Sequence, residues 1–117
     1  MQRNVNALVY DPRTGKALLD PGEAGAKDMT VASAITNALL SVNVAENPQP
    51  SATEKGKRYA LAEKVIAGQT SLSPLVDFSD EELARIKTVA DLYGTMVYGA
   101  ITTWADTDIP SNTAESA

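Results

Sequence analysis

Hydrophobic residues recur at alternating steps of three and four through residues 78–104, which is the pattern of a helix with one buried face. The start of this segment carries several helix-start signals. Ser79 can cap the first free N–H groups, and Glu82 can bond back to the cap. Phe78 and Leu83 occupy the two positions of a hydrophobic staple, in which one side chain before the helix packs against one in its first turn. The segment therefore predicts a capped helix that packs through a seam formed by Leu83, Ile86, Ala90, Tyr93, Val97, Ala100 and Trp104.

Gly94 interrupts this seam. A glycine inside a helix costs about 1 kcal/mol relative to alanine, so we expect a kink or a break there. A final helix is then expected over residues 95–105. Gly94, Gly99 and Ala100 would let a second backbone approach closely. The residues of this helix expected to point inward are Met96, Val97, Ala100, Ile101 and Trp104.

A further helix is predicted to begin at a cap formed by Asp28 or Thr30 and to extend to about residue 42. Its hydrophobic residues fall on one face, which indicates a helix buried along one side. The residues on this face are Val31, Ile35, Ala38, Leu39 and Val42.

Ser51 and Glu54 predict a second capping box, followed by a helix that ends at Ala67 with Gly68 as its stop signal. Its core face is expected to consist of Leu61, Ala62, Val65 and Ile66. A basic cluster on the opposite side is expected to be exposed, with Glu54 paired to Arg58 one turn on. A binding patch is the alternative interpretation of this cluster, which consists of Lys55, Lys57, Arg58 and Lys64.

Residues 4–20 predict a β-hairpin. Val5, Ala7 and Val9 stand at alternate positions, and the segment 11–15 contains the Asp, Pro and Gly typical of a turn. The competing interpretation is an extended arm with one tight turn. A lone hairpin is barely stable in water, so it must pack on the helices or pair with a neighbouring chain.

These segments predict a mainly α protein, with an N-terminal β-hairpin or extended arm followed by a small bundle of about four helices. Residues 1–106 would form a single domain, with the hairpin or arm at 1–20 and the helices within 28–106. Loops are expected at 20–27, 43–50 and 69–77, and a flexible acidic tail at 107–117.

The 117-residue chain has a net charge of −5, which argues against a nucleic-acid partner. The charge is uneven. Eight Lys/Arg and seven Asp/Glu give residues 1–75 a charge of +1, whereas two and eight give residues 76–117 a charge of −6. The acidic part is either a solvated helix surface or a face that docks on a basic partner through residues such as Asp80, Glu81 and Asp91.

The chain has no cysteine and no histidine, so thiolate chemistry, disulfides and the usual general base are absent. Its carboxylate clusters lack the spacing of a calcium loop. We therefore expect no enzymatic activity, cofactor or metal. No apolar stretch is long enough to span a bilayer, and the first residues do not resemble a signal peptide. The expectation is a protein without a membrane partner that is cytoplasmic when synthesised.

The aromatic residues Tyr93, Tyr98 and Trp104 stand at helical spacing. Core packing with the polar tips at the surface is one interpretation. Anchoring of an interface is the other, because Tyr and Trp dominate binding hot spots. With Val97 and Ala100, these residues are the candidates for a protein–protein interface on this helix.

Residues 54–65 (EKGKRYALAEKV) and 78–87 (FSDEELARIK) resemble a class of small helical proteins encoded by tailed bacteriophages. The shared pattern is a Lys/Arg-rich helix ending in an aliphatic pair, then S-x-E-E-x-x-x-I-K, then an aromatic and V-x-G. Tyr93 and residues 97–99 supply the last two parts. The resemblance covers about residues 30–105 and implies a viral accessory or assembly role, with no catalytic residues.

The favoured hypothesis is a non-enzymatic protein–protein interaction module, a phage-type virion or assembly accessory protein that is virion-associated. It would self-associate or dock on a larger virion protein through a helix face and a hairpin edge, as an oligomer or a subunit of a larger assembly. The alternative hypothesis is an acidic inhibitor that blocks a basic groove of a host protein through residues 77–91.

Overall fold

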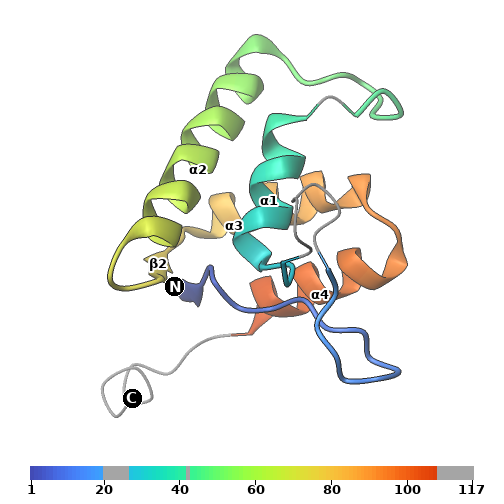
Figure 1. Ribbon diagram of the computed structural model, residues 1–117. Helices are drawn as coiled ribbons and strands as arrows, with labels where there is room; N and C mark the ends of the chain where they lie inside the picture. Colours follow the sequence, from blue (N-terminus) through green and yellow to red (C-terminus); the bar gives the residue numbers. More distant parts are fainter. Residues whose placement is uncertain (20–26, 42, 108–117) are drawn as a thin grey trace.

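The computed structural model describes residues 1–19, 27–41 and 43–107 (Figure 1). The mainly α prediction is confirmed: these residues form four helices with an antiparallel element at the N-terminus. The elements in chain order are β1 (Gln2–Asn4), α1 (Val31–Leu40), α2 (Ala52–Thr70), β2 (Leu75–Asp77), α3 (Asp80–Val89), the 3₁₀ turn η1 (Ala90–Leu92) and α4 (Thr95–Asp106).

The helix starts follow the predicted caps. The Thr30 side chain accepts a hydrogen bond from the Ser33 N–H, and the Ser51 side chain accepts one from the Glu54 N–H. At α3 both halves of the capping box are present, since the Glu82 carboxylate also accepts from the Ser79 N–H at 2.9 Å. These short polar side chains replace the partners that the first N–H groups of a helix lack.

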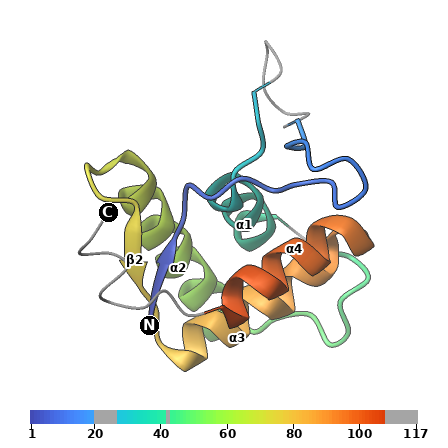
Figure 2. The same cartoon turned by 90° about the horizontal axis from the view of Figure 1, so that it is seen from below.

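Gly94 divides the last predicted helix, as expected. The chain turns through η1, and Gly94 becomes the N-cap of α4. Because of this break α4 folds back and packs against α3 and η1 (Figure 2). The predicted seam is therefore shared between two helices that face each other, and its members Leu83, Ile86 and Ala90 are buried.

The predicted hairpin turn is present at residues 11–15. Gly15 has a φ of 71°, and its N–H donates to the Asp11 carbonyl at 2.8 Å. Tyr10 pairs with Ala17, and the Leu18 N–H donates to the Val9 carbonyl at 2.8 Å. The hairpin packs in its own chain. The predicted linker at 20–27 lies almost wholly outside the described residues.

The N-terminal arm, residues 1–13, runs across the helices (Figure 1). Val5 and Val9 have no exposed surface. The carbonyls of Ala7 and Val5 accept hydrogen bonds from the N–H groups of Val31 and Ala32, at 2.8 and 2.7 Å. The arm thus supplies both hydrophobic side chains to the core and backbone acceptors to the start of α1.

The prediction of a loop over residues 69–77 was wrong for the last three residues, which form a strand. Residues 75–77 form β2, which pairs antiparallel with β1 in the register Arg3↔Val76 (Figure 2). A three-residue strand is too short to show an alternating pattern, and its partner lies more than 70 residues away in the sequence.

Two predictions for α2 were wrong. Gly68 does not end α2, which continues to Thr70, because the glycine lies buried inside the helix against Val76 of β2. Ile66 is 42 % exposed, outside the core face. The helix α1 ends at Leu40, and residue 42 lies outside the described residues.

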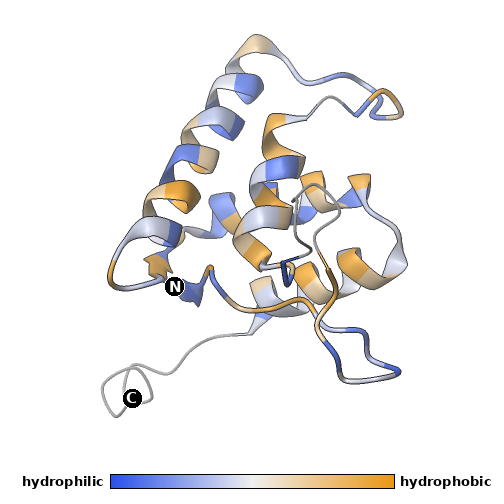
Figure 3. Ribbon diagram, viewed as in Figure 1, coloured by the Kyte–Doolittle hydropathy of each residue, from blue (hydrophilic) through white to orange (hydrophobic). Residues whose placement is uncertain are grey.

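The core lies where the arm, α1, α2, α3 and α4 meet. Hydropathy colouring shows α2 alternating between hydrophobic and hydrophilic residues along its length (Figure 3), as expected for a helix buried along one side. The largest fully buried side chains are those of Phe78, Ile35, Ile86, Ile101, Val5, Val9 and Val65.

Substitution of Gly68 by alanine should destabilise the protein by about 1–3 kcal/mol, because overpacking a filled site costs that much. A Cβ atom at Gly68 would overlap Cγ2 of Val76 and lie 3.4 Å from Cγ2 of Val5. Gly56→Ala in the same helix is the matched control, since a Cβ there meets nothing within 4 Å. It should stabilise by about 0.5–1 kcal/mol. Urea unfolding measures both, and equal stability of the two variants would contradict this packing.

Candidate functional site

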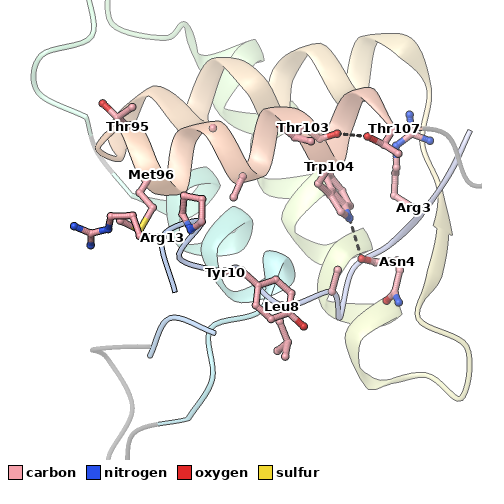
Figure 4. A pocket seen from close by; sticks show the side chains of 14 residues that line it. Arg3, Asn4, Leu8, Tyr10, Arg13, Thr95, Met96, Thr103, Trp104 and Thr107 are labelled. Atoms are coloured by element: carbon pink, nitrogen blue, oxygen red, sulfur yellow. Dashed lines mark hydrogen bonds between the residues drawn. The ribbon is translucent and has the colours of Figure 1, made fainter. Parts of the chain in front are cut away.

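A groove of about 960 Å³ separates the N-terminal arm from α4 (Figure 4). We call it the arm–α4 groove. Its lining is mostly apolar and comes from two segments that are about 90 residues apart in the sequence. The lining residues are Arg3, Asn4, Ala7, Leu8, Tyr10, Pro12 and Arg13 from the arm, and Thr95, Met96, Gly99, Ala100, Thr103, Trp104 and Thr107 from the α4 segment.

One end of the groove is closed by direct contacts between the arm and α4. The Trp104 indole N–H donates to the Asn4 carbonyl at 2.9 Å, and the ring meets Phe78 edge-on at a centroid distance of 5.8 Å. The buried Arg3 guanidinium donates to the Ala105 carbonyl from Nε at 3.2 Å and from Nη2 at 2.8 Å. A cation on the last carbonyls of a helix also complements the negative end of its dipole. This end is therefore fixed.

The other end of the groove is more open. Tyr10, which is 51 % exposed, borders it from the arm (Figure 4). On α4 this region carries Gly99 and Ala100, whose small size leaves the space between helix and arm unfilled. A Cβ atom built on Gly99 meets nothing within 4 Å. The groove thus has room for side chains that the protein itself does not supply.

The charged groups of the lining are both engaged within the chain. Arg3 is buried on the Ala105 carbonyl. Arg13 donates two hydrogen bonds to the Asp11 carboxylate, at 3.1 and 3.0 Å, and this contact lowers the pKa of Asp11. Among the described residues, no carboxylate lines the groove. A groove with such a lining can exclude water from an apolar ligand.

Of the helical interface candidates, Ala100 and Trp104 line the groove. The other three lie elsewhere. The Tyr93 hydroxyl donates to the Ala34 carbonyl of α1 at 2.7 Å and accepts from the Asn37 amide at 3.1 Å, so Tyr93 ties α1 to the turn before α4. Val97 packs on the core, and Tyr98 is exposed outside the groove.

Sequence reasoning missed the arm side of the groove and the outward-facing residues of α4. Leu8 and Tyr10 belong to the segment predicted as a hairpin, and nothing in that segment indicates that it lies along α4. On α4 the signal was present in part, because Gly99 was noted as a place where another backbone could approach. Nothing in the sequence around Thr103 indicated that this residue would line a groove.

The acidic candidates of the sequence do not form one face. Glu81 pairs with Lys57 at 3.3 Å and with Arg85 at 3.2 Å, and these contacts, that with Arg85 first, lower its pKa. Asp80 and Asp91 are exposed and make no ion pair with the described residues. Part of the negative charge at the start of α3 is thus neutralised by α2.

Arg58 is a correction to the predicted exposed basic cluster. It is 7 % exposed and donates to Glu46 at 2.7 and 3.1 Å. It also pairs with Glu54 at 3.0 Å, as predicted. Glu54 in turn accepts a bidentate contact from Arg85 at 2.9 and 3.0 Å. This chain of charges, Glu46–Arg58–Glu54–Arg85, joins the loop after α1 to α2 and α3, so it is a structural network.

Two further observations limit the kind of site present. Within the described residues, no group of three or more acidic side chains is placed to hold a metal ion. Among the helices of the same residues, none combines the length and the hydrophobicity needed to cross a bilayer.

Comparison with known proteins finds no matching family model, no matching curated protein and no matching solved structure. The assignment of the groove as the candidate site therefore depends on its residues and their geometry.

Replacement of Glu54 by glutamine should reduce the free energy of unfolding by about 1–2 kcal/mol at pH 7. Arg85 first, and then Arg58, hold the pKa of Glu54 below its ordinary value of 4.5. The stabilisation by a carboxylate with a lowered pKa is fully present above its unfolded pKa and is lost as the pH falls through the folded one. The difference between wild type and variant should therefore shrink below pH 4.5.

Urea unfolding at a series of pH values measures this effect. Glu63→Gln is the control, since Glu63 is exposed on the same helix and forms no ion pair with a described residue. A difference that stays constant down to the acid limit would show that the charge of Glu54 is not what stabilises the fold.

Proposed function

We propose that the protein is a non-enzymatic protein–protein interaction module that binds an apolar segment of a protein partner in the arm–α4 groove. The observation that carries this proposal is an open groove of about 960 Å³ whose two charged lining residues are already bound within the chain. A groove of this kind gains free energy by removing apolar surface of a partner from water.

The groove is suited to side chains projecting from a helix or a loop. One wall is the backbone of α4 at Gly99 and Ala100, and the other wall is the arm with Leu8 and Tyr10. Helix-in-groove recognition uses hydrophobic anchors in such a channel, and an exposed tyrosine at the rim is a residue type enriched in binding hot spots.

The setting proposed for this interaction is the assembly of a virion, where the protein would act as a phage-type accessory component. The support for this setting is the resemblance of residues 54–65 and 78–87 to small phage-encoded helical proteins. The alternative of an acidic inhibitor is less favoured, because Glu81 and Glu82 already pair with Lys57, Arg85 and Lys64 of the same chain.

Gly99→Leu should block the groove without loss of stability. The leucine side chain would enter the empty space beside α4, while removal of a mid-helix glycine gains about 0.5–1 kcal/mol. Gly56→Leu is the matched control, since it makes the same change at an open position of α2 outside the groove. Tagged full-length wild type and Gly56→Leu should capture a partner from cells of the source or from infected cells, and Gly99→Leu should lose it.

Direct titration completes the test. The chain contains a single tryptophan, Trp104, which lines the groove. Its fluorescence should therefore change when the purified partner binds to wild type or Gly56→Leu, with an affinity at least about tenfold higher than for Gly99→Leu. Equal capture and equal affinity of all three proteins would show that the groove is not the binding surface.

A further inference from the structure

The protein carries a second unusual hydrophobic feature, at the turn between α2 and β2. Leu72 has a relative exposed area of 107 %, the highest among the large hydrophobic residues described. It stands in a turn of four uncharged residues, Ser71, Leu72, Ser73 and Pro74, which we call the Leu72 loop. A leucine side chain left wholly in water forgoes the free energy that its burial would supply.

Residues on both sides of Leu72 are held by hydrogen bonds, so the backbone from which the leucine side chain projects is constrained. The Ser71 hydroxyl lies within hydrogen-bond distance of two carbonyl acceptors, that of Gly68 at 3.1 Å and that of Ser73. The Pro74 carbonyl accepts from the N–H of Val5 in the arm at 3.0 Å. A preorganised projection of this kind loses little conformational entropy when it enters a pocket.

The Leu72 loop and the arm–α4 groove are separate surfaces of one molecule. The loop shares no residue with the lining of the groove. In both Figure 1 and Figure 2 the turn between α2 and β2 lies away from α4. A chain therefore does not fill its own groove with Leu72.

We infer that the Leu72 loop of one copy inserts into the arm–α4 groove of a second copy. This inference rests on the proposed function, because it names the occupant of the same groove. The two surfaces match in charge. The arginines of the groove are bound within their own chain, so the groove favours an uncharged occupant, and the Leu72 loop is uncharged in a protein with a net charge of −5.

A contact between two different surfaces leaves one loop and one groove free on every dimer. Such heterologous contacts continue into open chains, or into rings when the rotation closes. The inferred mode of self-association is therefore head-to-tail, and each added copy buries one further Leu72.

Analytical ultracentrifugation of the full chain over a wide concentration range tests this inference. The mass of wild type should rise with concentration beyond that of a dimer. Leu72→Ser and Gly99→Leu should each weaken association by at least about tenfold, because each removes the burial of a leucine side chain. Two controls should associate as wild type does: Gly56→Leu, and Val44→Ser, which removes another aliphatic side chain that is 88 % exposed.

A mixture of the two variants gives the sharpest result. Leu72→Ser retains an intact groove, and Gly99→Leu retains an intact Leu72 loop. Mixed in equal amounts, they should form a one-to-one dimer and nothing larger, because that dimer has no functional loop or groove left.

The inference is overturned if wild type stays monomeric at all concentrations, if Leu72→Ser associates as wild type does, or if the mixture stays monomeric while wild type associates. A monomeric wild type that still captures a partner, with capture lost in Gly99→Leu, would reject self-association and leave the proposed function standing. A Gly99→Leu protein that both associates and captures normally would reject both.

Discussion

The docking of the N-terminal arm is the constraint on which the rest of the structure depends. Its first residues form a two-stranded sheet with β2, and the carbonyls of Val5 and Ala7 accept hydrogen bonds from the first N–H groups of α1. Its side chains Val5 and Val9 are fully buried in the core. Through Arg3 it also holds the end of α4. One extended segment thus bonds to three elements that are distant in sequence, and it converts a set of helices into one packed unit.

The groove is a consequence of this docking. The arm contacts α4 directly at Trp104, and the groove between the arm and α4 extends to Tyr10. Large residues on α4 would fill the space, but Gly99 and Ala100 do not. Gly99 weakens α4 as an isolated helix, so the stability of α4 depends on packing against α3 and η1 and on its hydrogen bonds with the arm.

Charge has a different role on the other side of the molecule. The network from Glu46 through Arg58 and Glu54 to Arg85 links three segments, with Arg58 almost completely buried. Removal of one member leaves a partly buried charge without its partner, which costs more than the intact pair contributes. The acidic C-terminal part is also partly neutralised within the chain, because Glu81 and Glu82 pair with Lys57 and Lys64 of α2.

Short-range patterns of residues were sufficient to predict the local structure. Ser79 with Glu82, Thr30 and Ser51 start the helices, Gly94 separates α3 from α4, and Gly15 shapes the turn of the arm, because these effects act over a few residues. Tertiary structure decided the rest: β2, the path of α2 past Gly68, the burial of Arg58 and the arm side of the groove. Each of these features depends on a contact between segments far apart in the chain. A local sequence pattern does not indicate which distant segments come into contact.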